Sequence, residues 1–89
     1  MRPRLKVVLS PAARRDLHER RQWSEYQAQR VVDQMTQMAA EGWNLGRASV
    51  AYPGFRWWPV PPLGVLYRVA GTELRVARVF HAAQLQELP

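Results

Sequence analysis

The densest apolar segment of the chain is the stretch 64–81, GVLYRVAGTELRVARVFH. Valine, leucine, tyrosine and phenylalanine dominate two runs on either side of Ala70-Gly71-Thr72. Residues of these types favour strands, and a glycine in so short a break is typical of a hairpin loop. We therefore predict a β-hairpin with one strand at about 64–69 and the other at about 74–80.

Arginines are interleaved with the apolar residues of this hairpin. Side chains alternate between the two faces of a strand, so Leu66 and Arg68 share one face of the first strand. In the second strand, alternation gives two sets: Leu74, Val76, Arg78 and Phe80, and Arg75, Ala77, Val79 and His81. Neither set is purely apolar, so alternation alone does not assign the core face. The arginines fit either charged side chains that extend to water near strand ends or a cationic concave face.

The N-terminal part predicts a short strand followed by a helix. Residues 4–9, RLKVVL, form an apolar run rich in β-branched residues that ends at Ser10-Pro11. Serine is favoured at the N-cap and proline at the first helical position, so a helix should begin here and extend to about Arg21 or Trp23.

A second helix is predicted from Ser24, which forms a capping-box pattern with Gln27. Apolar residues recur at helical spacing after it: Ala28, Val31, Val32, Met35, Met38 and Ala39. Gly42 is a natural C-cap. We expect the two helices to form a hairpin whose apolar seam faces inward and covers the sheet.

The segment between the second helix and the C-terminal hairpin is less regular. Residues 48–52 and 55–58 are compatible with two short strands, separated by a turn at Pro53-Gly54. The prolines that follow predict that 59–63 is a stiff loop without ladder pairing.

Trp57 and Trp58 are adjacent, so on a strand one side chain faces inward and the other outward. An outward tryptophan beside Arg56 is a candidate contact for a partner. The alternative is that both rings are half-buried under the proline-rich loop.

Composition adds a strong positive charge to this picture. The chain has 89 residues, which indicates a single domain over 1–89, and a formal net charge of +6. Lys6 is the only lysine, so every other cation is an arginine, which grips carboxylates and phosphates with a planar fork. The charge indicates an anionic partner, either nucleic acid or an acidic protein. A genome that favours arginine codons is the alternative explanation for the preference over lysine.

The sequence gives no sign of a cofactor, a metal site or a membrane segment. Cysteine is absent, so no thiol is available to bind a metal, and this fits a reducing compartment. No secretory signal is visible after the basic start, and no apolar run approaches the roughly 20 residues of a membrane span. We therefore expect a cytoplasmic protein.

Taken together, the order of these motifs resembles the RelE/ParE superfamily of bacterial type II toxins, and its ParE branch in particular. The resemblance rests on Ser10, Pro11, Ala13, Asp16 and Leu17, on Gly46-Arg47 and Phe55-Arg56, and on residues 66–69 and 76–81. It implies an α+β fold with an N-terminal helical hairpin packed on a three- or four-stranded antiparallel sheet.

The resemblance also implies a partner. Toxins of this kind are neutralised by a cognate antitoxin, here expected to be ParD-like with an acidic tail and to form a hetero-oligomer with the toxin. The basic first helix suits such a partner. The candidate antitoxin contacts are Arg14, Arg15, Leu17 and Arg21.

Two functions occur on this fold. RelE-like members cut mRNA on the ribosome by attack of a 2′-OH on the adjacent phosphate, which needs a base, an acid and cations. Arg56, Arg78 and His81 are the catalytic candidates for that chemistry, and Arg68 is a further source of charge. However, the tail after His81 contains no Tyr, Lys, Arg or His, groups that the nucleases of the family often use there.

ParE-like members instead bind DNA gyrase and stall it on cleaved DNA, with no catalytic residues of their own. We expect this second function, with ribosome-dependent mRNA cleavage as the alternative and a domain that only binds an antitoxin as another. The candidate target contacts are Arg56, Trp57, Arg68, Arg78 and His81.

Overall fold

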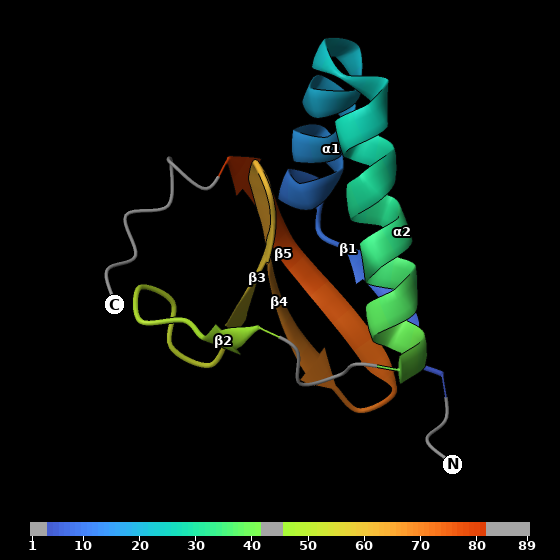
Figure 1. The fold of residues 1–89 in the computed structure, drawn as a ribbon. Coiled ribbons are helices and arrows are strands. Elements are labelled where there is room, and N and C mark those ends of the chain that lie inside the picture. Colours follow the sequence, from blue (N-terminus) through green and yellow to red (C-terminus); the bar gives the residue numbers. More distant parts are fainter. Residues whose placement is uncertain (1–3, 42–45, 82–89) are drawn as a thin grey trace.

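The computed structural model describes residues 4–41 and 46–81, and in these residues two helices cover one face of a five-stranded sheet (Figure 1). In chain order the elements are β1 (Lys6–Leu9), α1 (Pro11–Trp23), α2 (Glu25–Glu41), β2 (Arg47–Ala48), β3 (Arg56–Val60), β4 (Leu63–Ala70) and β5 (Glu73–His81). The strand order is β1-β5-β4-β3-β2. The predicted α+β class and helical hairpin are confirmed.

Serine caps set the start of both helices, as predicted. The Ser10 hydroxyl accepts a hydrogen bond from the Ala13 backbone N–H at 3.0 Å, and Pro11 occupies the first position of α1. The Ser24 hydroxyl accepts from the Gln27 N–H at 3.2 Å at the start of α2. These bonds satisfy backbone donors that a helix start leaves without an intrahelical partner. The predicted C-cap of α2, Gly42, lies outside the described residues.

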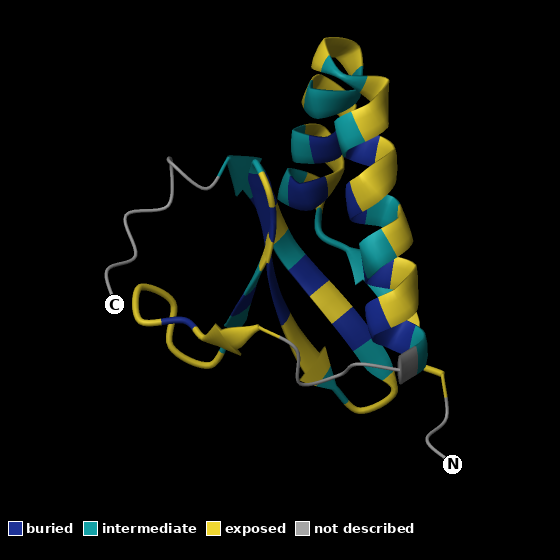
Figure 2. Cartoon of the chain, viewed as in Figure 1, coloured by how far each residue is buried: buried dark blue, intermediate teal, exposed yellow. Residues whose placement is uncertain are grey.

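The core lies between the helical hairpin and the sheet. Figure 2 shows buried positions recurring along both helices and along the central strands. The two helices and the residue before β1 contribute Leu5, Ala13, Leu17, Val31, Met35, Met38 and Ala39, and the later strands contribute Val60, Leu63, Val65, Tyr67, Leu74, Val76 and Val79. Burying each large aliphatic side chain stabilises the fold by about 1.5–3 kcal/mol, so this layer supplies most of the driving force.

A β-bulge in β5 decides which residues face the core. In the β4–β5 ladder Tyr67 pairs with Val76 but Leu66 pairs with Arg78, so Ala77 is an extra residue. A bulge shifts the alternation of side chains by one position. The core set of β5 is therefore Leu74, Val76 and Val79, and the opposite face carries Arg75, Arg78 and Phe80. This corrects the two sets that strict alternation predicts.

The sheet is mixed rather than purely antiparallel. β1 lies parallel to β5, with Val7 opposite Leu74 and Leu9 opposite Val76. Parallel neighbours need a crossover connection, and the helical hairpin that follows β1 begins that connection. The N-terminal run therefore extends the predicted three- or four-stranded sheet to five strands.

The proline-rich segment also differs from the prediction of a loop at 59–63. Pro59 pairs with Gly64 and Val60 with Leu63, so β3 and β4 form a hairpin whose turn is Pro61-Pro62. Proline is tolerated at this point because β2 does not extend to it, which leaves β3 an edge strand there.

The strand expected at 48–52 is shorter in the structure and begins one residue earlier. β2 comprises only Arg47 and Ala48, which pair with Trp57 and Arg56 of β3. The chain then turns, and the Phe55 N–H donates to the Tyr52 carbonyl at 3.1 Å. Local turn bonds thus replace the predicted strand after Ala48.

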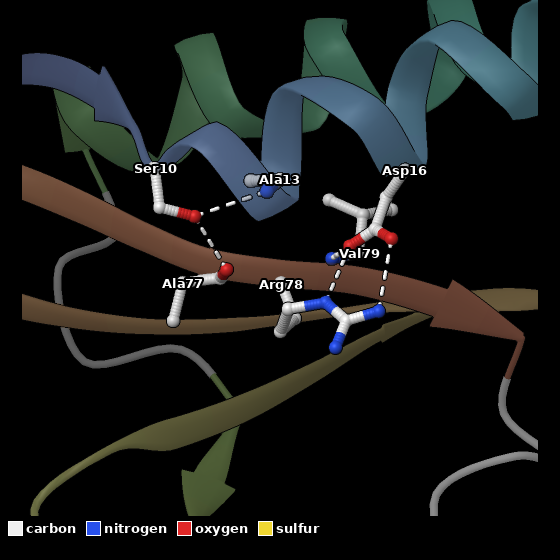
Figure 3. Close-up of polar contacts among 6 residues, drawn as sticks. All are labelled: Ser10, Ala13, Asp16, Ala77, Arg78 and Val79. Atoms are coloured by element: carbon white, nitrogen blue, oxygen red, sulfur yellow. Dashed lines mark hydrogen bonds and ion pairs between the residues drawn. The ribbon is translucent and has the colours of Figure 1, made fainter.

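Helix α1 closes the edge of β5 beyond the point where β1 ends. The Ser10 N–H donates to the Val76 carbonyl at 3.0 Å, and the Ser10 hydroxyl donates to the Ala77 carbonyl at 2.6 Å (Figure 3). Ser10 therefore serves both as the cap of α1 and as a partner for the bulged strand. Exposed strand edges are open to unwanted pairing, and covering them with a helix removes that hazard.

Asp16, two turns into α1 after its cap, completes this closure. Its Oδ2 atom accepts a hydrogen bond from the Val79 backbone N–H at 2.9 Å, and its two oxygens accept from the Arg78 guanidinium at 2.8 and 3.0 Å (Figure 3). The Asp16 side chain is only 13% exposed, whereas that of Arg78 is 44% exposed. The backbone contact is therefore the more protected of the two.

A second, smaller apolar cluster lies on the face of the sheet away from the helices. Trp57 is 5% exposed, and its ring centroid lies 5.6 Å from that of Phe80. The ring packs directly over Gly64, where an added Cβ would come within 2.0 Å of a ring carbon. Leu66, the β4 partner of Trp57, is buried beside it. The absence of a side chain at Gly64 therefore makes room for the tryptophan.

Replacing Asp16 with alanine is expected to lower the free energy of unfolding by about 2–3 kcal/mol. The change leaves the buried Val79 N–H without its partner and removes the acceptor of Arg78. Chemical denaturation of both proteins measures the difference. Asp33→Ala is the matched control, because Asp33 only accepts from Gln29 on the exposed side of α2, and it should change stability by less than about 0.5 kcal/mol. Equal effects of the two variants would contradict this role of Asp16.

Replacing Gly64 with alanine is expected to destabilise the fold by about 1–3 kcal/mol, because the new methyl group overlaps the Trp57 ring. In a Trp57→Leu background the same change should cost less than about 1 kcal/mol, because the ring is gone. Denaturation midpoints of the four proteins in this cycle provide the measurement. An equal cost in both backgrounds would show that the ring is not the obstacle.

Candidate functional site

The face of the sheet away from the helices presents two adjacent arginines. Arg68 of β4 and Arg75 of β5 stand directly opposite one another in the ladder, and both are exposed. Like charges in this position repel one another, so the arrangement costs stability unless something balances it. The Arg68 guanidinium lies 5.6 Å from the centroid of the Phe55 ring, and the Arg75 Nε donates to Glu73 at 2.8 Å.

These side chains line a groove of about 450 Å³. Its walls combine the two arginines with apolar groups, including Val8, Phe55 and Ala77. The groove can therefore offer a guanidinium fork and apolar contacts to the same ligand. We call it the open-face groove.

Arg78 also faces away from the helices, but its charge is already engaged. Both Asp16 oxygens accept hydrogen bonds from it, and its guanidinium lies 5.0 Å from the centroid of the Phe80 ring. The hydrogen bond to Asp16 raises the pKa of Arg78 above its usual value. Arg78 is thus a permanent cation that holds α1 to the sheet.

Arg56 belongs to the opposite side of the sheet from Arg68 and Arg78. It stands opposite Tyr67, a core residue, and donates to the Gly46 carbonyl at 2.8 Å. Burial raises the pKa of the Tyr67 hydroxyl, and hydrogen bonding to Arg56 together with its charge acts in the other direction. Arg56 therefore holds the start of β2 and the core tyrosine, and it does not join the other strand arginines.

The remaining target-contact candidates are His81 and Trp57. His81 ends β5 opposite Leu63, so it lies on the helix side of the sheet and is half-buried. Trp57 faces away from the helices, as an outward tryptophan should, but it is buried under its neighbours. Its ring is therefore not accessible on this face, which corrects its interpretation as an exposed contact. Trp58 packs against the core.

The antitoxin-contact candidates on α1 separate in the same way. Arg14 and Arg15 are exposed, and Arg21 forms an ion pair with Glu25 near the surface. Leu17 is only 7% exposed and belongs to the core, so it anchors α1 and does not reach a partner on this surface. This corrects its assignment as a contact.

A second hollow, of about 250 Å³, lies between α1 and the end of β5. Trp23, 77% exposed, stands at its rim, with the Arg20 guanidinium 5.2 Å from the centroid of its ring. Trp23 is not among the site residues that the sequence predicts. The available signal was weak: Trp23 is an aromatic residue at the end of a helix that has few apolar positions.

Sequence reasoning also missed the partners of the arginines. Asp16 was recognised only as part of a motif, because its partners are more than sixty residues away in the chain. The pairing of Arg68 with Arg75 was open to prediction, since a two-residue turn at Gly71-Thr72 fixes the hairpin register.

Among the described residues, no group of three or more His, Asp or Glu side chains is placed to hold a metal ion. The two described helices are also too short or too polar to cross a membrane.

Solved structures with the same fold include toxin–antitoxin proteins. The RelBE2 complex from Mycobacterium tuberculosis matches with a TM-score of 0.74 and 23% identity over 89% of this chain and 99% of that one. The chromosomal ParDE system of P. aeruginosa matches with 0.70 and 20%, over 88% and 96%. The YoeB dimer from Staphylococcus aureus matches with 0.71 and 15%, over 89% and 98%. At such identities these likenesses show the fold alone.

No curated protein matches the chain. The family described as "ParE toxin of type II toxin-antitoxin system, parDE" matches residues 7–86, which include α1, α2 and β2 to β5 in full. This match covers nearly the whole chain and agrees with the fold, the capped first helix and the arginine-bearing hairpin. The chain therefore belongs to the ParE toxin family of type II toxin-antitoxin systems.

Proposed function

We propose that this toxin acts by binding DNA gyrase and holding it on cleaved DNA, without catalytic residues of its own. The resemblance to the ParE branch supplies the target. The observation that favours a binding toxin over a ribonuclease is the dispersal of the three candidate catalytic residues over the sheet.

Cleavage of RNA by its own 2′-OH needs a base, an acid and cations converging on one phosphate. Arg56 and His81 lie on the helix side of the sheet, and Arg78 lies on the other side. Arg56 stands opposite Tyr67, and His81 stands opposite Leu63. Tyr67 and Leu63 are four positions apart on β4, so Arg56 and His81 are separated by about 13 Å along the strand direction alone. The three groups therefore do not surround a single phosphate.

The engagement of Arg78 points in the same direction. A phosphate that used this guanidinium would have to displace a carboxylate that already accepts two hydrogen bonds from it. Displacing Asp16 would also release the Val79 N–H that the same carboxylate satisfies. Arg78 is better suited to holding the fold than to stabilising a transient charge.

We also infer a cognate antitoxin that neutralises the toxin and forms a hetero-oligomer with it in the cytoplasm. The RelBE2 structure is described as a toxin–antitoxin complex and the P. aeruginosa one as a TA system. The net charge of +6 and the exposed Arg14 and Arg15 suit a ParD-like partner with an acidic tail.

Purified toxin is expected to stop supercoiling by gyrase and to cause cleaved DNA to accumulate, because the proposed action holds the enzyme after it has cut. Gel analysis of a relaxed plasmid with gyrase and ATP measures both products. In a parallel translation extract, mRNA should stay intact. Cleavage of mRNA at the ribosomal A site with normal supercoiling would show that the alternative function is correct.

Replacing His81 with glutamine is expected to reduce growth inhibition by no more than severalfold. Glutamine keeps a hydrogen-bonding side chain of similar length but cannot transfer a proton near neutral pH. If His81 were a general acid or base, the loss would be about 10²–10⁴-fold. Titrated expression in cells, with toxin levels measured by immunoblot, distinguishes these results. A loss of the larger size, with a normal melting temperature, would contradict a non-catalytic toxin.

A further inference from the structure

We propose that the open-face groove binds an acidic–apolar peptide segment of a partner protein, with one carboxylate held between Arg68 and Arg75. The assignment of that segment to the antitoxin rests on the proposed function. The groove lies on the sheet and is separate from the exposed arginines of α1.

The ladder places four side chains in a row across the sheet. Val8 of β1 stands opposite Arg75, and Arg75 stands opposite Arg68. Phe55 directly precedes Arg56, the partner of Tyr67, and lies beside Arg68, so it completes the row. The order is apolar, arginine, arginine, apolar. At a strand spacing of about 4.8 Å, the row is about 14 Å long.

This row matches an extended peptide with a defined pattern. In an extended chain, residues i, i+2 and i+4 point to one side and span about 13 Å. Apolar side chains at the two ends would contact Phe55 and Val8, and a carboxylate in the middle would meet both guanidinium groups. Such charge-assisted bonds are about twice as strong as neutral ones.

The state of the two arginines supports an anionic ligand. Arg68 has its ring contact with Phe55 and no carboxylate partner among the described residues. Arg75 is paired with Glu73, a neighbour on its own strand, in a half-exposed contact. Exposed ion pairs of this kind contribute little to stability, so an incoming carboxylate can replace Glu73 at little cost. The binding of that carboxylate would relieve the repulsion between the arginines.

The groove is less suited to a nucleic acid strand. The Arg68 guanidinium already lies beside the Phe55 ring, which limits the room for a stacked base. Glu73 at the edge of the groove repels a series of phosphates. The apolar ends of the row have no match in a sugar–phosphate backbone. We therefore assign the site to a peptide and leave nucleic acid as an outcome of the test.

The test is an NMR titration of the intact ¹⁵N-labelled toxin with two peptides, acetyl-Leu-Ser-Glu-Ser-Leu-amide and its Gln analogue. The Glu peptide should shift the amide signals of Val8, Phe55, Arg68 and Arg75, and bind about tenfold more tightly than the Gln peptide. Arg68→Gln and Arg75→Gln should each reduce this preference to less than about threefold. Arg30→Gln, a matched change of an exposed arginine on α2 outside the groove, should retain it. The unchanged remainder of each spectrum shows that the variant is folded.

Equal binding of the two peptides, or shifts confined to another surface, would overturn the proposal. So would a five-residue oligothymidine that shifts the same signals at lower concentration than the Glu peptide, because the groove would then be a nucleic acid site. The titration uses neither gyrase nor ribosomes. Its failure is therefore distinguishable from a failure of the proposed action on gyrase, which the supercoiling assay tests separately.

Discussion

The docking of α1 against the unpaired edge of β5 is the interaction on which the charged face of this toxin depends. β1 pairs with β5 only as far as Val76. Beyond that residue, the backbone of β5 forms hydrogen bonds with the side chains of Ser10 and Asp16 instead. The bulge at Ala77 lies where the pairing with β1 ends and the contacts with α1 begin. Because the bulge shifts the alternation, Val79 stays in the core while Arg78 turns toward the Asp16 carboxylate.

This arrangement gives the strand arginines three different roles. Arg78 holds the first helix, and Arg56 bonds to the carbonyl of Gly46 and to the core tyrosine. Arg68 and Arg75 remain at the surface, side by side. Positive charge on this fold is therefore divided between stabilising the domain and lining the open face of the sheet, and we propose that the second part binds a partner. On the same face of the sheet, the buried Trp57 packs against the half-buried Phe80.

Much of the fold follows from local sequence signals. The serine caps, the helical spacing from Ala28 to Ala39 and the break at Gly71 predicted both helices and the C-terminal hairpin, because these signals act over a few residues. The parallel pairing of β1 with β5 was not predictable in this way, because a four-residue apolar run does not specify which strand lies beside it. The bulge is visible in the spacing of the apolar residues, because Leu74, Val76 and Val79 are two and then three positions apart. A prediction from strict alternation does not take this change of spacing into account. The pairing of Asp16 with Arg78 depends on that bulge, so the role of Arg78 could not be inferred without it.

The same limit applied to the candidate site. Burial of Trp57 comes from packing between separate strands, and no local pattern distinguishes it from an outward tryptophan at the surface. Leu17, by contrast, lies four positions after Ala13, a helical spacing that indicates a core position. The open-face groove likewise brings together β1, the start of β3 and the β4–β5 hairpin.

We propose that this toxin acts by binding gyrase and not by cutting RNA. The most direct measurement is made in cells shortly after the toxin is induced, by mapping DNA ends that carry covalently bound gyrase and new 5′ ends in mRNA from the same culture. We expect gyrase-linked DNA breaks to accumulate while the mRNA ends match those of uninduced cells. New mRNA ends in register with codons, without gyrase-linked breaks, would contradict it.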